Sequence, residues 1–440
     1  MDALDTCHFA IQSKQHLRPR SNRTGRRLQG EVVIGSDFDA LRARTRNLVR
    51  HQWAGVPLIA FREIWLMACG TVLTAIALAY TVVAWTAVRK RIPVFASAAT
   101  RAPQATVLKA LCGAEHGLYE HLRSFCDQDH AEFQIIFGVA DANDEAVAIV
   151  RQLQRDFPAA DLHLVIDGKQ HGANRKVSNL INMACYARYD YLVVADSDIH
   201  VGRDYLSKVT LPLLDPTVGI VTCPYRGCPR AGLWSLLGSL FINDWFMPSV
   251  RVAALAGSRS FAFGSTIAVR RQVLSQIGGF HAVANQLADD YRLGELTRRI
   301  GLRTVLSEVV VETSVDERTL GDLFHHNVRW LRTIRAVRPV GHFLSFITFG
   351  VPIALIGCVC AGLSSATVVM SAMTMCARVM LHRANHQPLQ RLGSAWVLAL
   401  SDVFGMVLWA WSFVTHRVQW RNVQYSVHGD ACVEARPDVT

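Results

Sequence analysis

The sequence predicts an α/β domain carried between membrane-spanning segments. Strand-like apolar runs alternate with helix-like stretches from residue 104 to residue 320, a pattern typical of parallel βαβ units. An uncharged apolar run from Ile64 to Val88 precedes this region, and further apolar runs follow residue 341. Because about 20 apolar residues span a bilayer, these outer runs predict a protein held in a membrane.

The composition points to lipid rather than to nucleic acid. Hydrophobic residues make up 51% of the 440 residues and charged residues only 18%, which is more apolar than a typical soluble protein. The net charge is +11, with arginines crowded into residues 1–62 and again into 329–338. No nucleic-acid-binding motif accompanies them, so we expect contact with anionic lipid headgroups, with part of the N-terminal excess simply solvated. The eleven cysteines form no disulfide or metal framework, which favours a reducing environment.

Five segments follow from these patterns. The basic flank Arg89-Lys90-Arg91 predicts that the C-terminal side of the first span faces the cytoplasm. The expected segments are a disordered basic arm at 1–62, a transmembrane helix at 63–91, the α/β domain at 104–338, two or three membrane or re-entrant helices at 341–415, and a cytosolic tail at 416–440.

Within the α/β domain, strands and helices can be placed from their apolar periodicity. Gly232–Met247 is apolar and aromatic and is either an interfacial helix that admits lipid or a buried core helix. In sheets of this kind, ligands bind beyond the carboxyl ends of the strands. The predicted elements are strands at Phe133–Val139, Leu162–Ile166, Tyr191–Ala195 and Val218–Cys223, and helices at Glu145–Asp156 and Ser178–Tyr189.

The strongest chemical signal is Asp196-Ser197-Asp198, directly after the apolar run YLVVA. Two carboxylates at the end of a buried strand place anionic oxygens at the ligand-binding edge of the sheet. Mg²⁺ and Mn²⁺ take oxygen ligands and often share them with substrate phosphates. A loop or helix cap is the alternative, but the position favours a divalent metal held by Asp196 and Asp198.

Acidic residues also follow the strand Phe133–Val139. Asp141 and Asp144 are suited to bind the ribose or base of a nucleotide. Asp144 is equally suited to cap the helix that begins near Glu145. The sequence leaves both interpretations open, and it does not decide which of the two acids contacts a nucleotide.

Three further residues are candidates for proton transfer or phosphate binding. Asp289 and Asp290 begin a predicted helix, where acids also favour the helix dipole. One of them is suited to act as a general base for a hydroxyl. Lys176, in GANRKVSNL, lies at a helix N-terminus and is a candidate phosphate contact, with a solvated surface position as the alternative.

The segment His326-Asn327-Val328-Arg329-Trp330 combines a cation with an aromatic ring. An arginine at Arg329 can grip a diphosphate through two parallel hydrogen bonds. The indole of Trp330 can stack on a sugar or on an acyl surface. An interfacial belt of Arg and Trp is the alternative interpretation.

In this order, the motifs resemble those of the family-21 glycosyltransferases, the ceramide glucosyltransferases. That family has three acidic positions, here Asp144, Asp196 and Asp290, followed by (Q/R)xxRW, and GANRKVSNL is similar to its GxNxKxxNL segment. TVLKALCGAEHGLYEHLRSFCDQD and HNVRWLRTIRA look especially like the bacterial hopanoid-associated branch. The resemblance covers residues 104–338, with a loose match of a C-terminal W-R-x3-Y segment that begins at Trp420.

The resemblance implies a GT-A fold, the fold of nucleotide-diphospho-sugar transferases. It implies a UDP-sugar donor and a membrane lipid acceptor, either ceramide or hopanoid. Asp144 would contact the nucleotide, and Asp290 would be the catalytic base of an inverting transfer. Asp196 with Asp198 would hold the metal and the diphosphate. The residues implied to act on the acceptor side or in closing the site are Asp289, His326, Arg329 and Trp330.

One departure from the family pattern is His326, where the eukaryotic members have Gln or Arg. A processive polysaccharide synthase is an alternative function, against which His326 and the few C-terminal spans argue. A non-catalytic lipid-binding protein on the same fold is another, against which the full set of acids argues; a transporter would need more spans. We expect an integral protein of a bacterial inner membrane with its α/β domain in the cytosol.

Overall fold

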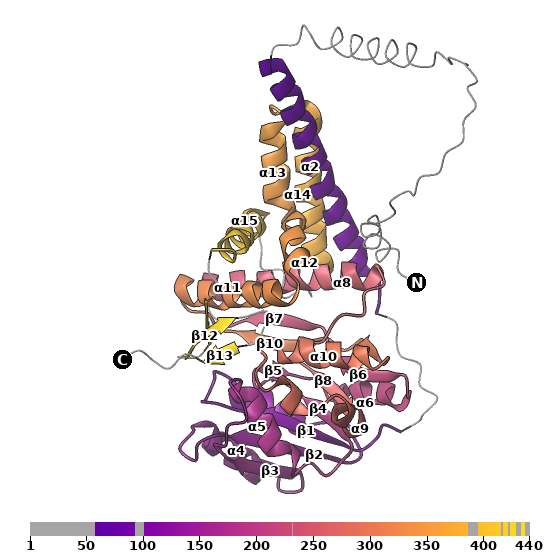
Figure 1. Ribbon diagram of the computed structural model, residues 1–440, viewed down its shortest axis with the longest axis vertical. Coiled ribbons are helices and arrows are strands. Elements are labelled where there is room, and N and C mark those ends of the chain that lie inside the picture. Colours follow the sequence, from indigo (N-terminus) through magenta and orange to yellow (C-terminus); the bar gives the residue numbers. More distant parts are fainter. Residues whose placement is uncertain are drawn as a thin grey trace, which may run out of the picture. The chain divides into compact units, whose positions relative to one another are not determined.

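The computed structural model describes residues 58–92, 101–230, 232–385 and 395–414, together with three short strands near the C-terminal end (Figure 1). Residues Glu63–Thr440 form one compact unit. The expected disordered basic arm at residues 1–62 lies almost wholly outside the described residues.

A seven-stranded mixed sheet forms the centre of the α/β domain. All neighbouring strands pair in parallel except β8, which is antiparallel to both of its neighbours. The order across the sheet is β3 (Asp161–Ile166), β2 (Phe133–Val139), β1 (Ala105–Ala110), β4 (Tyr191–Val194), β8 (Ile267–Arg270), β6 (Val218–Thr222) and β9 (Arg303–Leu306).

Alternate side chains of these strands build a hydrophobic core on each face of the sheet. Ile135 and Phe137 of β2 point to one face and Ile136 to the other, as the two-residue period of a strand requires. The helices that pack on the first face are α3 (Leu118–Cys126), α4 (Ala146–Asp156) and α6 (Tyr205–Thr210). Those on the second face are α5 (Arg175–Ala184), α9 (Arg271–Gln276) and α10 (Asp289–Arg299).

A second sheet of three strands lies beyond the carboxyl end of β4. Its order is β5 (Ile199–His200), β10 (Val311–Val315) and β7 (Tyr225–Pro229), with β10 parallel to β7 and antiparallel to β5. The chain then continues through α7 (Gly232–Leu240), a π-helical segment η2 (Phe241–Phe246), α8 (Met247–Leu255), α11 (Leu320–Val337) and α12 (Pro339–Leu344). Figure 1 shows α8, α11 and α12 between this sheet and the long helices.

The remaining elements are short or lie near the C-terminal end. They are η1 (Leu211–Leu214), η3 (Phe280–Val283), η4 (Ser345–Thr348), and a third sheet of β11 (Arg417–Trp420), β12 (Val423–Val427) and β13 (Val433–Ala435). The W-R-x3-Y segment begins at the end of β11, and its arginine falls outside the described residues.

The four predicted strands correspond to β2, β3, β4 and β6, each within one residue at either end. The helix predicted at Ser178–Tyr189 begins and ends earlier, at Arg175–Ala184, because the Asn174 side chain caps its first turn. The sequence analysis did not place β1, β8, β9 or the second sheet. The α/β prediction itself is confirmed.

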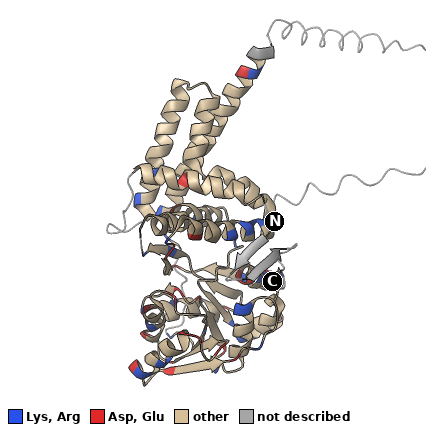
Figure 2. Cartoon of the chain, turned by 90° about the vertical axis from the view of Figure 1, so that its left-hand side faces the viewer, with Lys and Arg blue, Asp and Glu red and all other residues tan. Residues whose placement is uncertain are grey.

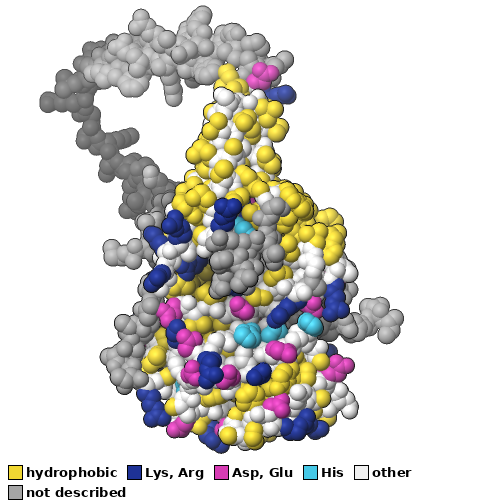
Figure 3. Space-filling view, turned by 180° about the vertical axis from the view of Figure 1, so that it is seen from behind, with side chains coloured by type: hydrophobic (Ala, Val, Ile, Leu, Met, Phe, Trp, Pro, Cys, Tyr) yellow, Lys and Arg dark blue, Asp and Glu magenta, His cyan; other side chains and the backbone are white. Residues whose placement is uncertain are grey.

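The first long helix is α2 (Leu58–Arg89), and its segment Phe61–Arg89 is long and apolar enough to cross a membrane. The backbone of Gly70 packs so closely on Gly357 that a Cβ there would collide with it, and Thr74 Oγ1 donates to the carbonyl oxygen of Ala354 over 3.4 Å. Small residues bring apolar helices together in this way. Figures 2 and 3 show few charges along the long helices, whereas charged side chains cover the α/β part.

The apolar runs after residue 341 form helices of different lengths and shapes. The run Phe343–Leu363 is divided into α12, η4 and α13 (Gly350–Cys360), and the two helical parts meet at a 72° bend. Pro352 lies in the first turn of α13. Proline has no backbone N–H, and in the first turn this costs nothing, because an N–H there would have no partner within the helix. α14 (Ser365–Asn385) is continuous through Arg378, and α15 (Ala395–Trp411) is a shorter apolar helix of 17 residues.

Buried ion pairs explain how α14 carries an arginine. The Arg378 guanidinium donates to Asp402 of α15 over 2.9 Å and to Asp244 of η2 over 3.2 Å. His382, one turn along α14, hydrogen bonds with Asp244 over 2.6 Å. All four side chains are at least nine-tenths buried. This network joins the C-terminal helices to the segment that follows α7.

Replacing Arg378 with Met should lower the free energy of unfolding by about 3–5 kcal/mol, because two buried carboxylates would lose their cation. Denaturant unfolding of the protein in detergent would measure the change. Arg383→Met is the matched control, since Arg383 lies on the same helix and is exposed. Equal midpoints for the two variants would contradict the stabilising role of the network.

Candidate active site

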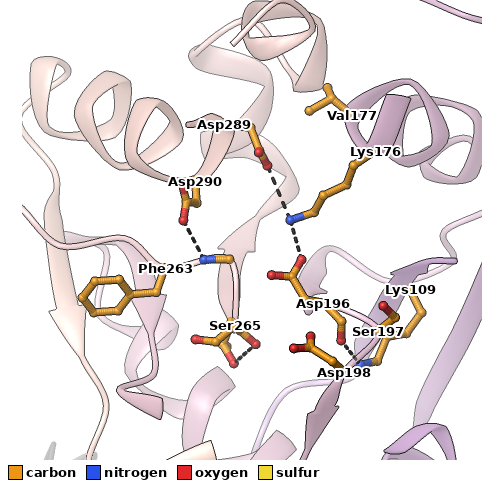
Figure 4. A network of polar contacts seen from close by, with 12 residues as sticks. Lys109, Lys176, Val177, Asp196, Ser197, Asp198, Phe263, Ser265, Asp289 and Asp290 are labelled. Atoms are coloured by element: carbon orange, nitrogen blue, oxygen red, sulfur yellow. Dashed lines mark hydrogen bonds and ion pairs between the residues drawn. The ribbon is translucent and has the colours of Figure 1, made fainter. Parts of the chain in front are cut away.

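Asp196, Ser197 and Asp198 follow β4 at the carboxyl edge of the main sheet (Figure 4). Neighbouring side chains hold this turn: Thr313 Oγ1 donates to Asp198 Oδ2 over 2.5 Å, and Ser197 Oγ donates to Glu115 Oε2 over 2.8 Å. Thr313 belongs to β10 and Glu115 to the loop after β1. The turn therefore presents Asp196 and Asp198 in a fixed arrangement.

Asp290 lies close to Asp196, although the two are far apart in the sequence. Asp290 is at the start of α10, and its carboxylate accepts hydrogen bonds from the backbone N–H of Gly264 over 2.8 Å and of Tyr291 over 2.7 Å. A Cβ on Gly264 would stand only 2.8 Å from Asp196 Oδ2. Gly264 thus fills the space between the two carboxylates, and the fold brings Asp196 and Asp290 together.

Lys176 connects Asp196 with Asp289. Its Nζ lies 2.5 Å from Asp196 Oδ1 and 3.7 Å from Asp289 Oδ2. Asn174, which caps α5, also donates to Asp289 Oδ1 over 3.4 Å. Burial alone would lower the pKa of Lys176, but the charges of Asp196 and Asp289 outweigh it and hold the pKa above its ordinary value. Lys176 is therefore a protonated counter-ion between two carboxylates.

Lys109 is a second buried cation, and the sequence analysis missed it as a site residue. It lies near the end of β1, is fully buried, and donates from Nζ to the backbone oxygen of Asp196 over 2.6 Å. Its Nζ also lies 3.5 Å from the centre of the Phe125 ring. Burial lowers the pKa of Lys109 to about 7, although the negative charges of Asp198 and Asp196 act to raise it.

The carboxylates of the site outnumber its cations. Burial raises the pKa of Asp198 to about 6, and the charge of Asp196 adds to the shift. Burial likewise raises the pKa of Asp290 to about 6, with the charge of Asp289 adding. The acids that act on Lys109 or Lys176 are Glu115, Asp196, Asp198, Asp289 and Asp290. Five carboxylates beside two lysines leave an excess of negative charge.

This excess fits a divalent cation at Asp196 and Asp198. Their oxygens are the hard ligands that Mg²⁺ and Mn²⁺ prefer. In the part of the chain that the structure describes, no group of three or more His, Cys, Asp or Glu side chains is arranged to hold a metal ion alone. Substrate phosphate or water would therefore complete the coordination.

Aromatic side chains connect α11 with the acidic cluster. The Trp330 ring lies edge-on to Tyr225 at 6.0 Å and 5.5 Å from Phe246. Tyr225 in turn packs against Phe263 at 5.9 Å, and Phe263 directly precedes Gly264. Burial raises the pKa of Tyr225 well above its ordinary value, and the charges of the site carboxylates add to this. Trp330 is thus one aromatic layer away from the acids.

His326 and Arg329 lie on the same helix as Trp330. The His326 ring is edge-on to Trp330 at 5.7 Å, and its Nδ1 hydrogen bonds with Glu317 Oε1 over 2.5 Å. Arg329 is half-buried beside Trp330. The structure therefore places the predicted segment near the acidic cluster and adds Glu317, which the sequence analysis did not single out.

Asp141 and Asp144 lie at the neighbouring strand end, after β2. Asp144 accepts hydrogen bonds from the backbone N–H of Gly113 over 2.9 Å and of Ala146 over 2.9 Å, so it both joins the loop after β1 and caps α4. Asp141 is exposed and accepts from the backbone N–H of Asn143 over 2.9 Å. The two acids follow β2, the second strand along the sheet from β4, and Asp144 also holds the loop after β1 through Gly113.

This sheet, with carboxylates gathered at the carboxyl edge of its strands, has the GT-A fold. A mannosyltransferase from Pyrobaculum calidifontis, solved with GDP-Man and Mn²⁺, matches the fold with a TM-score of 0.51 and 20% identity over 79% of this chain and 97% of that chain. The chain belongs to glycosyl transferase family 21, whose sequence profile matches residues 69–433. The family resemblance of the motifs is thereby confirmed.

Two curated relatives show what kinds of protein the chain is similar to. Ceramide glucosyltransferase 3 of Caenorhabditis elegans is 24% identical over 54% of this chain and 52% of its own length. An N-acetylglucosaminyltransferase of Rhizobium leguminosarum bv. viciae is 22% identical over 49% of this chain and 52% of its own length. The chain thus spans about half the length of these relatives.

Proposed function

We propose that this chain is an inverting hexosyltransferase that moves glucose or N-acetylglucosamine from a UDP-sugar to a hydroxyl of a membrane lipid, ceramide or hopanoid. The observation that carries the proposal is the convergence of Asp196 and Asp290 on either side of Gly264. Family membership and the names of the two relatives support a sugar transfer to a lipid.

The donor would lie along the carboxyl edge of the sheet. Asp141 and Asp144 would contact the nucleotide, and Arg329 would bind the diphosphate, which a guanidinium can hold through two hydrogen bonds. A divalent metal, Mg²⁺ or Mn²⁺, held by Asp196 and Asp198 would supply positive charge to stabilise the leaving diphosphate.

Asp290 is the proposed general base. Its carboxylate would accept the proton of the lipid hydroxyl while that oxygen bonds to the anomeric carbon and the bond to the diphosphate breaks, which inverts the configuration. Two backbone N–H groups fix its orientation, and burial raises its pKa toward the operating pH, as suits a base. Asp289 would keep Lys176 in place beside Asp196.

The lipid acceptor would approach from the side of the helices. α2 supplies a segment long enough to cross a membrane, and α7 leads through η2 to Phe246, which contacts Trp330. His326 and Trp330 would then contact the acceptor headgroup. We place the protein in a bacterial inner membrane with the α/β domain in the cytosol, as the basic flank Arg89-Lys90-Arg91 predicts.

Incubating membranes that contain the protein with labelled UDP-glucose or UDP-N-acetylglucosamine tests the proposal. We expect one labelled lipid, which mass spectrometry identifies as a monoglycosylated ceramide or hopanoid. A high-molecular-mass polymer would instead support a polysaccharide synthase. An absence of nucleotide-sugar binding in calorimetry would support a non-catalytic lipid-binding protein.

The pH dependence of transfer should reflect Asp290. Because the base acts in its ionised form and its pKa is raised to about 6, kcat/KM should rise through about pH 6 and level off above it. Below the pKa, the rate should fall about tenfold for each pH unit. Initial rates between pH 4.5 and 8, at saturating metal, measure this profile. A rate that is constant down to pH 4.5 would contradict the assignment.

A further inference from the structure

The carboxylate of Glu317 is buried but only half satisfied. Its side chain is 9% exposed, and Oε1 bonds with His326 Nδ1 over 2.5 Å. Oε2 is buried and makes no hydrogen bond within the described residues. Buried acceptors are nearly always paired, so a carboxylate kept in this state is more readily explained by a function than by stability.

Glu317 is not required to cap the helix that follows it. α11 begins with a complete capping box, in which Thr319 Oγ1 accepts from the backbone N–H of Asp322 and the Asp322 carboxylate accepts from the backbone N–H of Thr319. The helix terminus is therefore satisfied without Glu317. The described contact of its carboxylate is with His326.

The hydrogen bond with Glu317 selects the tautomer of the imidazole. When Nδ1 donates to the carboxylate, the neutral ring has its lone pair on Nε2, which can accept a hydrogen bond. The His326 side chain is 39% exposed, so this acceptor is open to an incoming group.

The pair lies between the apolar helix α7 and the aromatic layer of the site. A Cβ on Gly238 of α7 would stand 3.1 Å from Glu317 Oε2. On the other side, the His326 ring is edge-on to Trp330, which packs against Tyr225. The polar pair therefore lies between α7 and the aromatic rings that border the site.

We propose that Glu317 is a positioning residue that holds His326 so that Nε2 accepts a hydrogen bond from the hydroxyl-bearing headgroup of the lipid acceptor. The inference rests on the proposed function. It accounts for the histidine at the first position of the motif, because a histidine presents one defined acceptor only when its other nitrogen is held.

Steady-state kinetics in detergent, with N-hexanoyl ceramide as acceptor and UDP-glucose as donor, test the inference. Glu317→Gln should raise the acceptor KM about tenfold, the loss expected for a hydrogen bond that depends on a charged group. The donor KM and the slow hydrolysis of UDP-glucose by water should stay at wild-type values. Asp316→Asn is the matched control, since Asp316 is the adjacent acid and pairs with Arg318 instead.

A double-mutant cycle with His326→Ala separates positioning from a general structural effect. If Glu317 acts through His326, the double variant should be no worse than His326→Ala alone. Additive losses, or a wild-type acceptor KM in either single variant, would refute the positioning role. If the wild-type protein transfers neither glucose nor N-acetylglucosamine to a ceramide or a hopanoid and hydrolyses neither UDP-sugar, the proposed function fails and this inference falls with it.

Discussion

Asp290→Asn should abolish sugar transfer while leaving donor binding near its wild-type value. An amide cannot accept the proton of the lipid hydroxyl, and a positioned general base contributes about 10²–10⁴-fold to the rate. The amide oxygen can still accept from the backbone N–H of Gly264, and the hydrogen bond from the N–H of Tyr291 is lost, so most of the local structure should persist. Turnover of a lipid acceptor and calorimetric binding of the UDP-sugar measure the two effects separately.

The matched control for this variant is Glu295→Gln. Glu295 lies on the same helix α10, and its half-buried carboxylate pairs with Arg292 and Arg299. We expect this change to leave turnover within about twofold of wild type, because both of these partners belong to α10 itself and neither is a residue of the proposed site. Wild-type turnover in purified Asp290→Asn would show that another residue is the general base.

Removing divalent metal should eliminate activity, and adding Mg²⁺ or Mn²⁺ should restore it. The physical reason is the charge of the site, where five carboxylates face two lysines before a diphosphate adds further negative charge. Assays in excess chelator, followed by titration with each metal, measure the dependence. Full turnover in chelator would show that Lys176 and Lys109 suffice as counter-ions.

Asp198→Asn provides an independent test of the same site. This variant should bind Mn²⁺ more weakly in electron paramagnetic resonance titrations, because the amide lacks the anionic charge of the ligand it replaces. Asp204→Asn is a suitable control, since Asp204 is an exposed acid paired with Lys208 beyond the next strand. Equal Mn²⁺ affinity in the two variants would show that Asp198 is not a ligand of the metal.

Local patterns were sufficient to predict the class of fold and part of the site. The run YLVVA gave the strand, and a strand that ends in Asp196 and Asp198 places them at the sheet edge whatever the rest of the chain does. Asp289 and Asp290 could be identified because acidic residues in the first turn of a helix either act on a ligand or interact favourably with the helix dipole. Such inferences depend on spacing along the chain, which the sequence contains directly.

The contacts that complete the site depend on tertiary structure. Lys109 was not identified from the sequence, because its partner is the distant Asp196. Tyr225 and Glu317 carry no local signal, because each matters through residues that only folding brings near. The ion pairs of Arg378 likewise join residues that are far apart in the chain.

Periodicity and composition predict a domain of strands and helices with acidic strand ends, joined to apolar helices. These features can be read from the sequence because short segments carry them. The folded chain, and not the sequence, reveals that Asp196, Asp290 and Lys176 share one site and that His326 is held by Glu317. The reason is that burial, close approach and charge balance arise between segments distant along the chain, and packing alone sets those distances.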